Sequence, residues 1–208
     1  MNPGYLSLLL ISITVILLAS GWKEVLVRGI SHKVILLFFM LWLGSLGIVV
    51  HWQGWSVYCC FLLVALMSVA IVLRTEGFLQ KCHLLSSGLL MGSIYFFLRE
   101  AAYVLPVLMS HDELQSGMIL GFSAFLLTRQ PLPQTACICL GLIVGDIYFA
   151  YVHQAQGYHA ALGDPQFQDR WWMAIWTARG CSLVWLGMLS GGKQAVKVWQ
   201  NRGKGNRG

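Results

Sequence analysis

One carboxylate, Asp146, lies in the middle of an apolar run that spans residues 135–152. A charge facing lipid at that depth would cost several kcal/mol, so we expect Asp146 to be buried against other helices and paired with a cation. Two further apolar runs carry charges at a similar depth: Arg99 and Glu100 in one, and Arg179 in the other. Two arginines and two carboxylates sum to zero charge. We therefore predict that these four side chains meet in one intramembrane charge network.

Aromatic side chains are expected around this predicted network. At about 100° per residue, Tyr95 and Arg99 share one face of their helix. Trp172 and Trp176 lie within two turns of Arg179 and are placed to stack on its guanidinium group. The residues predicted to support the network are Tyr95, Tyr103, Trp172 and Trp176.

The predicted network has two main interpretations. The preferred one is a structural clamp that fixes which helices pair, because a neutral buried cluster suits packing specificity. The alternative is the proton or solute site of a small transporter or channel, because ionisable groups inside a membrane often mark transport pathways. An intramembrane enzyme of unknown type is the third interpretation.

Catalytic signatures are poor. Intramembrane aspartyl proteases carry a Gly-x-Gly-Asp motif, but Ile143 stands in place of its first glycine, and no second membrane aspartate completes a dyad. Ser123 sits in a context that faintly resembles a rhomboid nucleophile, yet the later spans hold no internal histidine to act as its base. No phosphate loop, zinc-ligand spacing or dinucleotide motif is present. We predict a protein without enzymatic activity, metal or cofactor.

The composition indicates a helical membrane protein. Only 11% of the residues are charged, whereas soluble domains carry about a quarter, and the mean hydropathy is +0.68. Serial apolar runs are each about long enough to cross the roughly 30 Å hydrocarbon core. The predicted fold is all-α, a bundle of seven transmembrane helices. The runs cover residues 4–22, 34–50, 56–73, 84–109, 115–128, 135–152 and 171–191.

One apolar run has an alternative interpretation, and one connection is predicted to be a long loop. The fourth run contains Pro106, which predicts a kink, and a rival interpretation breaks that run at Arg99 and leaves residues 101–109 as a re-entrant or interfacial piece. Residues 153–170 are predicted to form the one long loop, with Gly163-Asp164-Pro165 as a turn.

The distribution of basic residues sets the expected orientation. With the C-terminus in the cytoplasm and the N-terminus outside, every loop or tail Lys and Arg except Arg170 falls inside. Residues 1–192 then form one transmembrane domain, and residues 193–208 form a basic cytoplasmic tail whose end, 203–208, is expected to be disordered. The net charge of +6 is dispersed in this way, so we expect anionic lipids at the tail and no nucleic-acid partner.

Pairs of glycines four residues apart predict close helix packing. A helix without side chains at such positions lets its neighbour approach, and this packing drives association in lipid. The four pairs are Gly88 and Gly92, Gly117 and Gly121, Gly141 and Gly145, and Gly187 and Gly191.

The layout resembles a known family. The length, the seven spans, Gly145-Asp146 in a late span and Trp171-Trp172 at the start of the last one resemble the YphA-like family of membrane proteins from spore-forming Gram-positive bacteria. The resemblance implies a bacterial plasma membrane and a part in the spore envelope, and it implies no catalytic residue. We expect an accessory or scaffold protein that binds a membrane protein or a second copy of itself.

Overall fold

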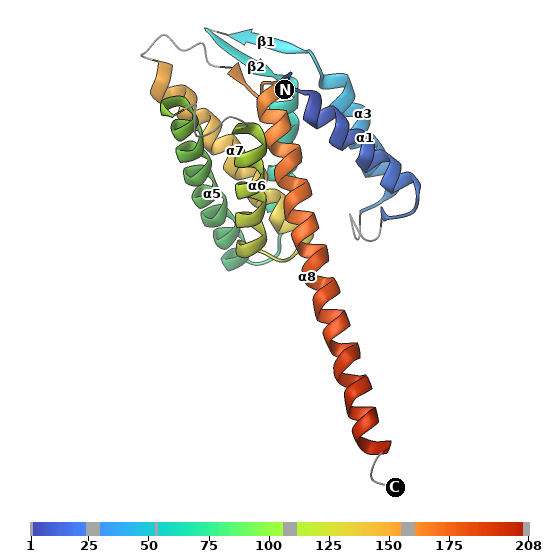
Figure 1. Ribbon diagram of the computed structural model, residues 1–208. Coiled ribbons are helices and arrows are strands. Elements are labelled where there is room, and N and C mark those ends of the chain that lie inside the picture. Colours follow the sequence, from blue (N-terminus) through green and yellow to red (C-terminus); the bar gives the residue numbers. More distant parts are fainter. Residues whose placement is uncertain (1, 24–29, 53, 106–111, 155–160, 206–208) are drawn as a thin grey trace.

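The structure is a computed structural model that describes residues 2–23, 30–52, 54–105, 112–154 and 161–205, with only the backbone described beyond Met188 (Figure 1). The described residues form seven helices and three short strands. The helices are α1 (Tyr5–Ala19), α3 (His32–Ser45), α4 (Cys59–Arg74), α5 (Phe78–Val104), α6 (Asp112–Leu127), α7 (Pro131–His153) and α8 (Pro165–Gly205). The strands are β1 (Val49–Trp52), β2 (Trp55–Tyr58) and β3 (Ala161–Leu162). Consecutive helices run in opposite directions, and the strands lie at one end of the bundle (Figure 1).

Glycines bring α5 and α7 into contact along their length. A Cβ atom built on Gly145 would lie 2.6 Å from the Tyr95 ring, and one on Gly141 would lie 2.5 Å from the Cβ of Met91. Gly88 and Gly92 of α5 face α7 in the same way, at 2.7 Å and 3.1 Å from its side chains. Real Cβ atoms essentially never approach below 3.0 Å, so glycine at positions 88, 141 and 145 permits this helix spacing, and the contact at Gly92 is tight.

A second glycine pair joins α6 to α8. A Cβ on Gly117 would lie 2.7 Å from the Cβ of Met173, and one on Gly121 would lie 2.5 Å from the carbonyl oxygen of Ala174. The pair predicted on α8 differs. Among the described residues, a Cβ on Gly187 meets no atom within 4 Å, and the surroundings of Gly191 lie outside the described part of the chain, so close packing of this pair stays a prediction.

The helices differ in whether they are long enough to span a membrane. Among the described residues, two helices, α5 and α7, are long and apolar enough to cross a membrane by length and composition. Three others, α1, α3 and α4, are apolar but only 15, 14 and 16 residues long. A helix needs about 20 residues to cross a 30 Å core without help, so the shorter helices depend on flanking residues or on a thinned bilayer.

The second predicted span ends earlier than the sequence indicates. Helix α3 stops at Ser45, and Gly47 takes a positive φ of 83° that turns the chain out of the helix. Residues 49–52 then pair antiparallel with β2, with His51 opposite Ser56. The predicted extension of this span to residue 50 is therefore wrong, because β-branched Val49 and Val50 continue into a hairpin.

The predicted loop over residues 153–170 contains structure. Leu162 of β3 pairs in parallel with Val57 of β2. Helix α8 begins at Pro165, six residues before the predicted start, because the Asp164 carboxylate accepts a 2.7 Å hydrogen bond from the Phe167 amide and caps the first turn. At its other end α8 continues to Gly205, and residues 206–208 of the segment expected to be disordered lie outside the described residues.

The fourth predicted span is a continuous helix through Arg99. This contradicts the rival interpretation that breaks the run at this arginine, since α5 continues to Val104. Leu105 leaves the helical conformation, with φ −127° and ψ 65°, as a residue before proline tends to do. The predicted kink at Pro106 lies outside the described residues.

Candidate functional site

Asp146 is buried at the contact between α5 and α7, with 1% of its surface exposed. One carboxylate oxygen pairs with the guanidinium group of Arg99 and lies 3.5 Å from the hydroxyl of Tyr95. The other oxygen accepts a 3.3 Å hydrogen bond from the amide of Gly163. The close approach at Gly145 explains this geometry, because it holds the next residue of α7 against the polar face of α5.

Aromatic rings surround the Arg99 guanidinium group. The ring of Phe149, three residues after Asp146 on α7, lies 4.0 Å from its central carbon, and the ring of Tyr95 lies at 5.9 Å. Such contacts stabilise a desolvated cation through the electron-rich ring face. The side chain of Arg99 is 9% exposed. The cation is thus held by a carboxylate on one helix and by rings from two.

A second buried arginine, Arg170, was missed by sequence reasoning. It was assigned to an outer loop, but its side chain is only 2% exposed because it lies in the second turn of α8 and points into the bundle. It donates to both carboxylate oxygens of Asp112, at 3.0 Å and 2.8 Å, and to the Tyr95 hydroxyl at 3.3 Å. The Asp164-Pro165 helix start was the signal that could have placed Arg170 inside.

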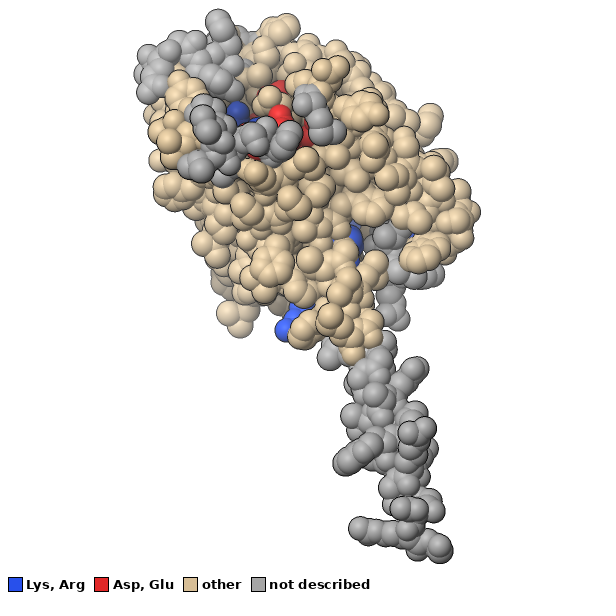
Figure 2. Space-filling view, in the orientation of Figure 1, with Lys and Arg blue, Asp and Glu red and all other residues tan. Residues whose placement is uncertain are grey.

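These contacts form one polar network of five residues: Asp112, Arg170, Tyr95, Asp146 and Arg99. Tyr95 is its centre, because its hydroxyl accepts from Arg170 and faces Asp146. The network joins α5, α6, α7 and α8, and the Gly163 amide ties in the turn after β3. Its two cations and two anions cancel. Figure 2 shows acidic and basic atoms together in a hollow at the end of the bundle that carries the strands.

Glu100 lies outside the polar network, contrary to the prediction. Its Oε2 atom lies 3.4 Å from Nε2 of His153, at the end of α7. The Nδ1 atom of His153 lies 3.0 Å from the carbonyl oxygen of Phe149, and the ring of Tyr103 packs against the imidazole with a centroid separation of 5.0 Å. One residue along a helix is a rotation of about 100°, so neighbouring Arg99 and Glu100 face different partners.

Arg179 also lies apart from Asp146, and the prediction that it joins the network is wrong. Its guanidinium group donates to the carbonyl oxygen of Pro131 at 2.6 Å and to the Thr135 hydroxyl at 3.3 Å, both in the first turns of α7. Asp146 is eleven residues further along α7, about 16 Å away at 1.5 Å per residue. The early start of α8 explains the error, because the predicted depth was counted from residue 171.

The tryptophans expected near Arg179 dock the first helices instead. Trp176 donates from its indole nitrogen to the Thr14 hydroxyl of α1 at 3.1 Å. Trp172 stacks on Phe39 of α3 with a centroid separation of 6.1 Å. Asp169 adds a third link, since its carboxylate accepts hydrogen bonds from the backbone amides of Gly4 and Ser7 at the start of α1. Helix α8 is therefore the element on which α1 and α3 assemble.

The buried cysteines take part in packing contacts. Cys60 donates from its thiol to the carbonyl oxygen of Gly163 at 3.1 Å, and Cys139 accepts from the indole nitrogen of Trp171 at 3.3 Å. Within the described ranges, no group of three or more His, Cys, Asp or Glu side chains is arranged to hold a metal ion. The chemistry that the described side chains offer is charge pairing and hydrogen bonding.

Comparison with known protein families shows the family of the chain. Residues 28–207, which include every helix from α3 to α8, match the model of the family described as YphA-like integral membrane protein. The chain belongs to this family. It is a helical integral membrane protein, in agreement with the apolar helices α5 and α7. Searches of curated proteins and of solved structures gave no match.

Proposed function

We propose that this YphA-like protein is a non-enzymatic accessory or scaffold protein that crosses the bacterial plasma membrane seven times. Its polar network would act as a clamp that holds four helices in one arrangement. The observation that carries this proposal is the pairing of both buried network arginines with carboxylates from other helices. Charges that satisfy one another in this way stabilise a fixed assembly and leave little affinity for a solute.

The proposed topology has its N-terminus outside and its C-terminus in the cytoplasm. Alternating helix directions fit seven crossings, because each helix then carries the chain to the opposite membrane face (Figure 1). The burial of Arg170 removes the one basic residue that the sequence had assigned to the outer side. The remaining loop and tail cations all fall on the cytoplasmic side in this orientation, as the positive-inside rule requires.

The partners that we propose follow from the surface and the tail. Helix α8 contains 41 residues and would be about 60 Å long, twice the hydrocarbon thickness, so its last turns project into the cytoplasm. This basic extension suits anionic lipid headgroups. A membrane-protein partner or a second copy is proposed for the scaffold role, and a part in the spore envelope is proposed with it. Nucleic acid is not proposed.

The decisive experiment measures thermal stability of the purified Asp146→Asn variant in detergent. A clamp loses an ion pair and leaves Arg99 uncompensated, at a cost of about 3–5 kcal/mol in the free energy of unfolding. A transport site would instead tolerate the substitution and lose flux of a proton or solute in reconstituted vesicles. Parental stability of this variant would refute the clamp and favour a transporter.

A further inference from the structure

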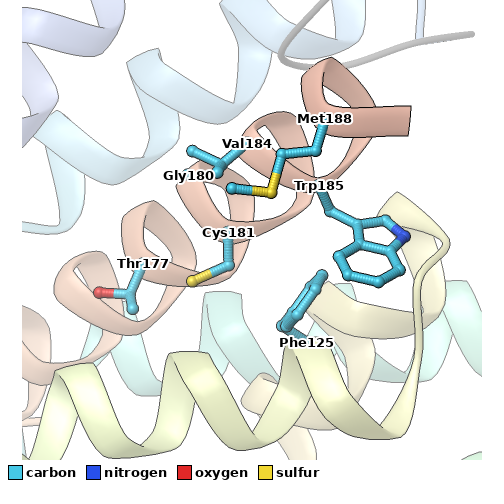
Figure 3. A pocket seen from close by; sticks show the side chains of 7 residues that line it. All are labelled: Phe125, Thr177, Gly180, Cys181, Val184, Trp185 and Met188. Carbon is cyan, nitrogen blue, oxygen red and sulfur yellow. The ribbon is translucent and has the colours of Figure 1, made fainter. Parts of the chain in front are cut away.

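An apolar groove lies where α6 ends and α8 continues without it. Its volume is about 460 Å³, and α8 contributes most of its lining. The lining residues are Thr177, Gly180, Cys181, Val184, Trp185 and Met188 of α8 and Phe125 of α6 (Figure 3). Their spacing of three and four residues places the α8 residues on one face of that helix.

Two features make this surface concave. Gly180 has no side chain, and a Cβ atom there would meet no described neighbour within 4 Å. Trp185 stands out from α8 and meets Phe125 edge to face, with ring centroids 6.4 Å apart. Figure 3 shows these two rings facing each other at one end of the groove, while the side chain of Cys181 lies nearer the other end. The result is an open, shallow apolar groove.

A cation stands beside the aromatic end of the groove. The guanidinium carbon of Arg129 lies 4.9 Å from the centre of the Trp185 ring. Arg129 follows the end of α6 by two residues. In the view of Figure 2, basic atoms occur toward the lower part of the bundle, near α8, and acidic atoms only in the upper hollow. The groove therefore combines apolar walls with a positively charged end.

The groove lies at the depth of one lipid leaflet in the proposed orientation. Met188 is 23 residues from the start of α8 at Pro165, about 35 Å along the helix axis. A core of about 30 Å that begins at Pro165 ends near Trp185, so Thr177 to Trp185 lie in its cytoplasmic half. Met188 and Arg129, which lies beside Trp185, are then near the headgroups. Acyl chains and phosphates of the inner leaflet occupy these same two levels.

We propose that this groove binds one anionic glycerophospholipid. An acyl chain would lie along Cys181 and Val184, and the phosphate would accept hydrogen bonds from Arg129. Charge selects the lipid over a second copy of the chain, because two copies meeting at this face would bring two Arg129 cations together. Charge also disfavours a zwitterionic lipid, whose own ammonium group competes for the phosphate. The site is distinct from the basic tail. Only the leaflet that supplies the lipid depends on the proposed orientation.

The test uses the full-length protein in an uncharged detergent, titrated with phosphatidylglycerol whose acyl chains carry bromine. Bromine quenches tryptophan fluorescence at contact, so we expect a saturable component of quenching that the Trp185→Phe variant lacks, above the quenching of the eight other tryptophans that both proteins share. Arg129→Gln should weaken the apparent affinity about fivefold, as expected for one charge contact near a membrane. The matched control is Arg74→Gln, which removes an exposed cation at the end of α4 and should leave the affinity unchanged.

Three results would overturn the proposal. Equal affinity for brominated phosphatidylcholine would show a groove that ignores headgroup charge. An equal loss in Arg74→Gln would show diffuse attraction to the basic surface. Efficient Cys181–Cys181 cross-linking under oxidant, in a variant whose other cysteines are serine, would assign the groove to a second copy. Thermal unfolding of each variant with the parental midpoint confirms that the groove is intact.

Discussion

Gly145 of α7 and Tyr95 of α5 are in direct contact, and a Cβ atom on the glycine would lie 2.6 Å from the tyrosine ring. This contact sets the spacing of the two helices. It also positions the hydroxyl of Tyr95 between Asp146 and Arg170, so the polar network depends on the packing of the two helices.

Gly145→Ala tests that dependence. The methyl group must displace the Tyr95 ring or the backbone of Gly92, and such overpacking costs about 1–3 kcal/mol in the free energy of unfolding. Gly180→Ala is the control, because its Cβ atom meets no described neighbour within 4 Å and alanine favours a helix. Thermal unfolding in detergent should rank Gly145→Ala below the parent and leave Gly180→Ala at or above it. Equal midpoints would show that the helices separate freely.

The pairing of Asp146 predicts a selective rescue. Asp146→Asn alone leaves Arg99 without its carboxylate, and we expect a loss of about 3–5 kcal/mol in the free energy of unfolding. Adding Arg99→Gln removes the uncompensated cation and should restore much of that stability. Adding Arg179→Gln should restore none, because Arg179 binds Pro131 and Thr135 at the other end of α7. Equal rescue by both arginine changes would contradict the observed pairing.

Much of this pairing could be predicted from local sequence. The cost of a carboxylate in lipid requires a partner for Asp146, and the helical periodicity of α5 places Arg99 on the face that carries Gly88, Gly92 and Tyr95. What the periodicity could not supply was the start of α8. Asp164-Pro165 indicates a turn and a helix cap equally well, and choosing the turn shifted every depth along the last helix.

The errors over Arg170 and Arg179 share that origin. Counting from residue 171 put Arg170 in the outer loop and Arg179 level with Asp146. Because α8 starts at Pro165, both arginines lie six residues further from the helix start than predicted. Arg170 therefore binds Asp112, and Arg179 binds the first turn of α7. The pairing of β3 with β2, which draws the loop inward, joins residues about a hundred positions apart and leaves no local pattern.

Arg170 and Asp112 should be energetically coupled. Their two hydrogen bonds, at 2.8 Å and 3.0 Å, join the starts of α6 and α8. A double-mutant cycle with Arg170→Gln and Asp112→Asn should give a coupling free energy of about 0.5–3 kcal/mol, measured by thermal or denaturant unfolding. The control is the same cycle between Arg170 and Glu76, an exposed residue in the connection between α4 and α5, and it should give additive effects. Additive effects in both cycles would show that the Arg170 side chain is solvated and does not bind Asp112.

The proposed orientation makes a prediction about accessibility. Single cysteines are introduced into an otherwise cysteine-free chain at Ala161 and at Gly77. Ala161 of β3 pairs with Ser56 just before α4 and Gly77 follows α4, so the two positions lie at opposite ends of that helix. A membrane-impermeant maleimide added to intact cells should label the first and spare the second until the membrane is opened. The physical reason is the distribution of cations, since Arg74 and Lys81 flank residue 77 and resist translocation. Labelling of the Gly77 position in intact cells would reverse the orientation, and labelling of both positions would contradict a seven-span chain.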